Sequence, residues 1–187
     1  MSLILTGCGP VSGAITFIEQ ALEKQWNIDV IATKQAMAIM EKNRENEAIE
    51  RRIGGRIRTG YDDPRPPFAN AYIVAPASAN SIAKMANCTA DTYVTSLMLE
   101  VIGRKIPVVV LPSLKACVAE RQPFVRNVLS LREEGVTVLL GGKHGIHPTN
   151  DSSKDGLLPP FPWNLAIEAT MRRLEVKNVI FYLLLVS

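Results

Sequence analysis

The sequence predicts one α/β domain, in which a parallel sheet carries helices on both of its faces. Apolar and β-branched runs of four to six residues alternate with segments that have the apolar spacing of helices. Strands that alternate with helices form right-handed βαβ units, and such units give a parallel sheet. The length of 187 residues suits one hydrophobic core, so we expect a single domain over residues 1–187.

Five strands and six helices are expected along the chain. The strands are predicted at residues 3–6, 28–32, 71–74, 106–111 and 136–140. The helices are predicted at residues 14–24, 34–40 with a continuation to 49, 80–86, 91–102, 124–134 and 163–174. Three consecutive valines make the fourth strand the clearest of the five, and glycines at positions 54, 103 and 135 mark helix ends.

Two long loops and an apolar tail fall outside this alternation. Residues 56–68 contain three prolines and residues 141–162 are irregular, and loops of this length in a compact domain are often functional. The apolar run 179–186 is too short to cross a bilayer, which takes about 20 residues in a helix. We expect it to form a final strand or an interface segment, and we expect no membrane partner.

Composition excludes several classes of function. The net charge is only +3, and acidic residues interrupt the basic stretches, so no nucleic-acid partner is expected. Cys8, Cys88 and Cys117 form no disulfide framework and the first residues show no secretory signal, which predicts a cytoplasmic protein. His144 and His147 have no third ligand nearby, so we expect solvated loop histidines and no metal site.

The turns after the first two strands are rich in glycine and hydroxyl groups. Ligands of open parallel sheets bind outside the carboxyl ends of the strands, where helix N-termini converge. The first turn holds Gly7, Gly9, Ser12 and Gly13, and the second begins with Thr33. These residues suit a phosphate, although a structural turn and a helix cap explain them equally well. NAD sites usually place Asp or Glu where Thr33 stands, which favours a mononucleotide.

The turn after the third strand is the most distinctive. Its small side chains leave room for a flat ring against the backbone, and Ser78 and Asn80 supply hydrogen-bonding groups. Asn80 or Ser81 is equally suited to cap the next helix. The expected ligand contacts in this turn are Ala75, Pro76, Ala77, Ser78, Asn80 and Ser81.

This turn, together with Lys84 and Asp91 downstream, resembles the flavin-binding signature of the flavin-containing cysteine decarboxylase superfamily. Members include phosphopantothenoylcysteine decarboxylases, lantibiotic decarboxylases and flavin prenyltransferases, and the resemblance covers most of residues 3–140. It implies a three-layer Rossmann-like (flavodoxin-like) fold, bound FMN, and a homo-oligomer, either a trimer or a dodecamer of trimers. It assigns the phosphate or ribityl end to Gly7, Gly9, Ser12, Gly13 and Thr33, and the ring and ribityl chain to Pro76, Ala77, Ser78 and Asn80.

Two motifs of that superfamily are missing. The decarboxylases carry Pro-x-Met-Asn-x-x-Met-Trp after the fourth strand, whereas residues 112–119 read Pro-Ser-Leu-Lys-Ala-Cys-Val-Ala, with Lys115 in place of the substrate-binding asparagine. Residues 61–64 read Tyr-Asp-Asp-Pro and lack the catalytic histidine. Lys115 is a candidate partner of a substrate carboxylate, or a plain surface lysine, and Asp62 or Asp63 is a candidate base.

The resemblance implies an FMN-dependent, decarboxylase-like oxidoreductase that acts on a small carboxylate or cysteinyl substrate. One alternative is an FMN-dependent reductase or electron-transfer flavoprotein, which needs no dedicated acid or base. Another is a catalytically silent subunit that uses the same scaffold for regulation or binding.

Overall fold

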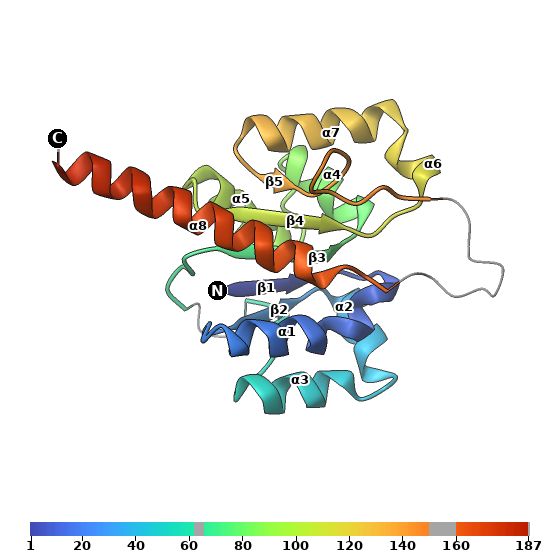
Figure 1. Cartoon of the computed structure of the whole chain (residues 1–187). Helices are drawn as coiled ribbons and strands as arrows, with labels where there is room; N and C mark the ends of the chain where they lie inside the picture. The colour runs from blue at the N-terminus through green and yellow to red at the C-terminus, as the bar shows by residue number, and fades with distance from the viewer. Residues whose placement is uncertain (62–65, 150–159, 187) are drawn as a thin grey trace.

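A computed structural model describes the backbone of residues 1–61, 66–149 and 160–186, and the side chains as far as Val176 (Figure 1). Five parallel strands form its sheet, in the order β2-β1-β3-β4-β5. Their bounds are Ser2–Leu5 for β1, Asp29–Ala32 for β2, Tyr72–Ala77 for β3, Val108–Pro112 for β4 and Thr137–Val138 for β5. This order confirms the predicted flavodoxin-like parallel sheet. From β1 the chain first adds β2 on one side and then β3, β4 and β5 on the other, so the strand order reverses between β1 and β3.

Helices cover both faces of the sheet, as Figure 1 shows. Their bounds are Gly9–Gly13 for the 3₁₀ helix η1, Ala14–Glu23 for α1, Lys34–Glu41 for α2, Glu45–Ile53 for α3, Ala79–Ala86 for α4, Tyr93–Gly103 for α5, Ala116–Ala119 for α6, Gln122–Glu133 for α7 and Trp163–Val186 for α8. Side chains from α1, α2, α3 and α8 pack in one core cluster, and side chains from α4, α5 and α7 pack in the other.

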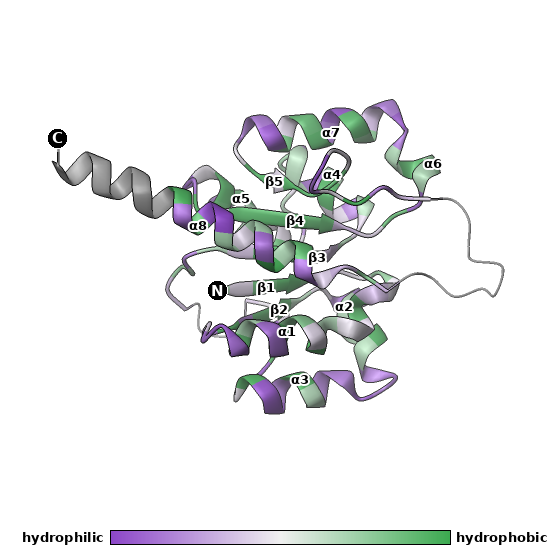
Figure 2. Ribbon diagram, in the orientation of Figure 1, coloured by the Kyte–Doolittle hydropathy of each residue, from purple (hydrophilic) through white to green (hydrophobic). Residues whose placement is uncertain are grey.

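The two cores follow from the alternation of side chains along each strand. In β1, Leu3 and Leu5 point into the cluster that holds Phe17 and Trp163, whereas Ile4 points into the cluster that holds Met98. All but Trp163 are fully buried, and each large apolar side chain buried in this way contributes about 1.5–3 kcal/mol. Figure 2 shows hydrophobic residues along the central strands and hydrophilic residues on the outer helices α3 and α7.

Three sequence predictions are corrected here. The expected helix over residues 34–49 is broken, because Arg44 adopts the left-handed conformation (φ 57°) and separates α2 from α3. The expected final strand at residues 179–186 is wrong, because α8 continues as a helix to Val186. Extending a formed helix fixes one residue at a time, whereas a new strand needs a sheet edge. The fifth strand is also shorter than expected, at two residues.

The predicted loop over residues 56–68 begins with regular pairing. The backbone N–H of Arg58 donates to the Val30 carbonyl, and the N–H of Ala32 donates to the Arg58 carbonyl, so this segment pairs with the outer edge of β2. The Arg58 side chain is buried and forms an ion pair with Asp29. Within the described residues, none of the helices has the length and apolarity that a membrane span requires.

Candidate functional site

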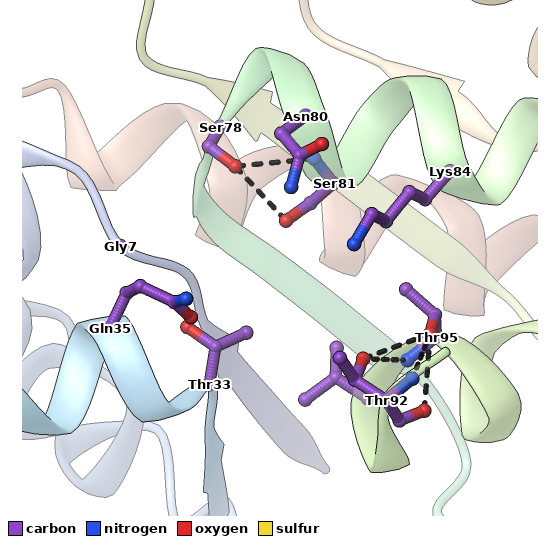
Figure 3. A pocket seen from close by; sticks show the side chains of 10 residues that line it. Gly7, Thr33, Gln35, Ser78, Asn80, Ser81, Lys84, Thr92 and Thr95 are labelled. Carbon is purple, nitrogen blue, oxygen red and sulfur yellow. Dashed lines mark hydrogen bonds between the residues drawn. The ribbon is translucent and has the colours of Figure 1, made fainter. Parts of the chain in front are cut away.

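A cavity of about 220 Å³ opens at the carboxyl ends of β1, β2 and β3, next to the reversal of strand order. We call it the N-cap cavity. Figure 3 shows Thr33 and Gln35 on one side of it, and Ser78, Ser81 and Lys84 on the other. Its lining residues are Gly7, Thr33, Gln35, Ser78, Asn80, Ser81, Lys84, Thr92, Val94 and Thr95. The structure therefore brings together five residues predicted from the sequence, namely Gly7, Thr33, Ser78, Asn80 and Ser81.

Three helices start at this cavity, and each has a hydroxyl N-cap. Thr33 Oγ1 accepts from the Ala36 N–H at 3.2 Å at the start of α2, and Ser78 Oγ accepts from the Ser81 N–H at 3.2 Å at the start of α4. Thr92 caps α5 in a reciprocal capping box. The N-terminal ends of helices carry a partial positive charge, so this convergence favours an anion. Thr33 and Ser78 thus cap helices and line the cavity at once.

A lysine adds a full positive charge to the same cavity. Lys84, on α4, directs its ammonium group into the open space in Figure 3 and lies 2.6 Å from Asp91 Oδ2. The hydrogen bond from Lys84 is the largest cause that lowers the pKa of Asp91 below its usual value, so this carboxylate stays ionised at neutral pH. Among the described residues, Lys84 is the only cationic side chain that lines the N-cap cavity.

Thr6 holds the two central turns together at the reversal point. Its side chain is fully buried, and its Oγ1 donates to the Pro76 carbonyl at 2.8 Å and accepts from the Ser78 N–H at 2.7 Å. The end of β1 is therefore tied directly to the residue that begins α4. Gly7 follows, and a Cβ atom there would lie 2.4 Å from Gln35 Cβ, so only glycine lets this turn approach α2 so closely.

A second cavity of about 450 Å³ adjoins the first and shares Thr33, Gln35, Thr92 and Val94 with it. We call it the tyrosine cavity, because Tyr61 and Tyr93 line it and stack edge to face with ring centroids 5.1 Å apart. Its remaining lining residues are Lys34, Thr59, Gly60 and Asp91. Because they share four lining residues, we treat the two cavities as one cleft, and residues 59–61 of the predicted functional loop contribute to its wall.

The family of the chain follows from comparison with known proteins. Residues 1–161 match the family model described as Flavoprotein. This chain belongs to the Flavoprotein family. The match agrees with the predicted membership in the flavin-containing cysteine decarboxylase superfamily.

One curated relative and several solved structures are similar to this chain. An uncharacterised protein of Methanocaldococcus jannaschii is 28% identical, and the match covers 72% of this chain and 86% of that protein. The FMN-dependent cysteine decarboxylase SpaF has the same fold, with a TM-score of 0.65 and 23% identity over 74% of this chain and 81% of SpaF. A mutant form of PPC decarboxylase has a TM-score of 0.64 at 17% identity over 94% of this chain and 97% of that one.

The remaining residues that the sequence predicts to contact the cofactor do not line the cleft. Ala75, Pro76 and Ala77 are buried inside β3, behind the turn. Gly9 and Gly13 line a separate hollow of about 420 Å³, where a Cβ atom on Gly13 would lie 3.1 Å from the Trp163 indole nitrogen. Ser12 lies between them in η1.

The one predicted catalytic residue that the structure describes, Lys115, does not line the cleft. Lys115 is exposed at the start of α6, and Asp62 and Asp63 lie outside the described residues. His147 is exposed, with Nε2 3.1 Å from the Gly142 carbonyl oxygen, and it lines a different hollow; His144 is exposed as well. Across residues 1–61, 66–149 and 160–176, no cluster of three metal-ligating His, Cys, Asp or Glu side chains occurs.

Five residues that line the N-cap cavity were not among the predicted contacts: Gln35, Lys84, Thr92, Val94 and Thr95. A signal existed for the two threonines, because a threonine before an apolar helical run is a typical N-cap. A signal also existed for Lys84, which belongs to the stretch that resembles the flavin-binding signature, whereas no local pattern reveals Gln35.

Proposed function

We propose that this flavoprotein binds FMN in the cleft formed by the N-cap and tyrosine cavities. The observation that carries the proposal is the convergence of three hydroxyl-capped helix N-termini and the Lys84 ammonium group on one small cavity. This donor set suits a phosphate. The N-cap cavity alone is smaller than the roughly 300–1,000 Å³ of typical ligand pockets, so the cofactor extends beyond it.

The rest of the lining suits the remainder of FMN. Hydroxyl groups of Ser78, Ser81 and Thr92 match the ribityl chain, and the exposed Asn80 amide has no hydrogen-bond partner among the described residues. The superfamily resemblance supports contacts of Pro76, Ala77, Ser78 and Asn80 with the ring and the ribityl chain. Membership in the Flavoprotein family and the FMN-dependent fold neighbour SpaF support the same cofactor.

The decisive measurement is a visible absorption spectrum of the purified protein with mass spectrometry of the released chromophore. Flavin bands with the mass of FMN support the proposal. A colourless protein that also fails to bind added FMN contradicts it. Asn80→Trp should abolish flavin binding without unfolding the protein. Asn43→Trp, at an exposed asparagine outside both cavities, is its control and should keep full flavin content.

For the reaction, we propose decarboxylase-like oxidoreductase chemistry on a small carboxylate or cysteinyl substrate, in a homo-oligomer. Bound FMN supplies the redox chemistry, and the protein positions the substrate and excludes water. The fold shared with SpaF and PPC decarboxylase supports this reaction. Release of carbon dioxide from a cysteinyl compound tests it, and light scattering tests for a trimer or a dodecamer.

A second candidate is an FMN-dependent reductase or electron-transfer protein. The described lining of the cleft includes lysines, tyrosines and Asp91 but no histidine, and this favours the second candidate. Electron transfer needs an accessible flavin and no dedicated acid or base. Bleaching of the flavin by NAD(P)H without carbon dioxide release supports this candidate. Co-purification with an active relative would instead support the catalytically silent subunit.

A further inference from the structure

The Lys84–Asp91 ion pair lies at the boundary between the two cavities. Lys84 lines the N-cap cavity, and Asp91 lines the tyrosine cavity. The side chain of Lys84 is only 25% exposed, and that of Asp91 is 49% exposed. Asp91 Oδ1 also accepts from Thr95 Oγ1 at 3.4 Å, which holds the carboxylate against the first turn of α5. Asp91, which lines the tyrosine cavity, therefore holds the Lys84 ammonium group at the edge of the N-cap cavity.

The lysine retains donors for a second partner. An ammonium group has three N–H donors, and Asp91 is the one acceptor that the structure gives it within hydrogen-bond distance among the described residues. The N-cap hydroxyls are neutral donors, and those of Ser78 and Thr92 also lie within hydrogen-bond distance of the Ser81 and Thr95 hydroxyls, at 3.0 and 2.8 Å. A dianionic group in the N-cap cavity thus finds its strongest free donors on Lys84.

We propose that Lys84 is the residue that lets the site distinguish a phosphorylated flavin from riboflavin, and that Asp91 opposes this selectivity by competing for the ammonium group. The inference rests on the proposed flavin site, but it concerns the phosphate alone. Charge-assisted hydrogen bonds are about twice as strong as neutral ones, so loss of Lys84 weakens phosphate recognition markedly. Neutralising Asp91 releases the ammonium group and strengthens it.

The two variants separate this role from a structural one. A surface ion pair that only joins α4 to α5 contributes little to stability, and removing either partner then has the same small effect. Competition between Asp91 and the phosphate for the Lys84 ammonium group predicts effects of opposite sign. Lys84→Met should lower FMN affinity relative to riboflavin affinity, whereas Asp91→Asn should raise it. The ratio of the two affinities is the readout, because both residues line the proposed cleft and only the phosphate distinguishes FMN from riboflavin.

The experiment measures dissociation constants of FMN and riboflavin by flavin fluorescence, in the wild type and three variants. The affinity ratio of FMN to riboflavin should fall about ten-fold or more in Lys84→Met and rise several-fold in Asp91→Asn. Lys24→Met is the control, since it removes the same charge from an exposed residue that follows α1, away from the cleft. Its ratio should stay unchanged.

The outcomes also separate this inference from the proposed function. If the wild type binds neither flavin, the proposed flavin site is wrong. If both flavins bind and the ratio in Lys84→Met equals that of the wild type, the site stands and the role of Lys84 is refuted. If Lys84→Met fails to fold, Asp91→Asn decides, because a ratio that falls or stays constant in that variant overturns the proposal.

Discussion

Replacement of Thr6 by valine tests how the two central turns are held in place. Valine has the shape of threonine but no hydroxyl, so the substitution removes the bond to the Pro76 carbonyl and the acceptor of the Ser78 N–H. The Pro76 carbonyl keeps a partner, because the backbone N–H of Thr6 also donates to it at 3.3 Å. The Ser78 N–H loses its partner, and it lies in a part-buried environment.

The magnitude follows from that one unpaired donor. A buried N–H without an acceptor costs about 1–3 kcal/mol, and the lost side-chain bond to Pro76 adds about 1 kcal/mol at most. For a chain of this length each kcal/mol corresponds to a shift in Tm of about 2–4 °C. We therefore expect Thr6→Val to lower the free energy of unfolding by about 2–3 kcal/mol and to weaken flavin binding through displacement of Ser78.

A second buried threonine provides the control. Thr170 is also fully buried, and its hydroxyl donates to the Ala166 carbonyl within α8 at 2.7 Å without accepting from any N–H in the described residues. Thr170→Val should therefore cost less than about 1 kcal/mol. Urea unfolding with an unchanged m-value measures both variants. Equal destabilisation by Thr6→Val and Thr170→Val would refute the reasoning.

Three further predictions concern the first turn, the thiols and acid pH. Gly7→Ala should destabilise the protein by about 1–3 kcal/mol in urea unfolding, because its Cβ meets α2, whereas Gly9→Ala, with open space around it, should be neutral. Burial raises the pKa of Cys8, so at about pH 8 a thiol reagent should label the two exposed cysteines faster than Cys8, and unfolding should remove the difference. The lowered pKa of Asp91 means that its pairing with Lys84 stabilises the folded state above about pH 4 and is lost as the pH falls through the lowered value. The stability difference between the wild type and Asp91→Asn should accordingly vanish at low pH, and a constant difference down to about pH 2 would contradict this assignment.

The sequence predicted the sheet well because each strand is a separate apolar run between turn residues. Breaks inside a helical pattern were not predictable, since a left-handed Arg44 follows from how α3 packs on α1 and not from its own side chain. The apolar run 179–186 has no periodicity, so its composition suits a strand and a helix alike. Its state depends on the helix that precedes it.

The candidate site was predicted in part, for a related reason. Residues that directly follow a strand, such as Thr33 and Ser78, reach the cavity because the carboxyl ends of parallel strands share one edge. Lys84 lies in the second turn of α4, so the packing of that helix brings it to the cavity, whereas Thr95 lies in the first turn of α5. At Gly7, predicted as a phosphate contact, the structure shows a close approach to Gln35, which local sequence does not reveal.

The position of α8 bears on how the protein is made. Its first turns lie beyond the residues matched by the family model, yet Trp163, Ala166 and Ile167 complete the core against β3, β4 and α1. A chain still on the ribosome presents the apolar side chains of β3 and β4 uncovered until residue 170 has emerged. Completion of this core therefore waits until residues 163–170 have been synthesised, and a fragment that stops before Trp163 should be rescued by adding a peptide that spans residues 160–176.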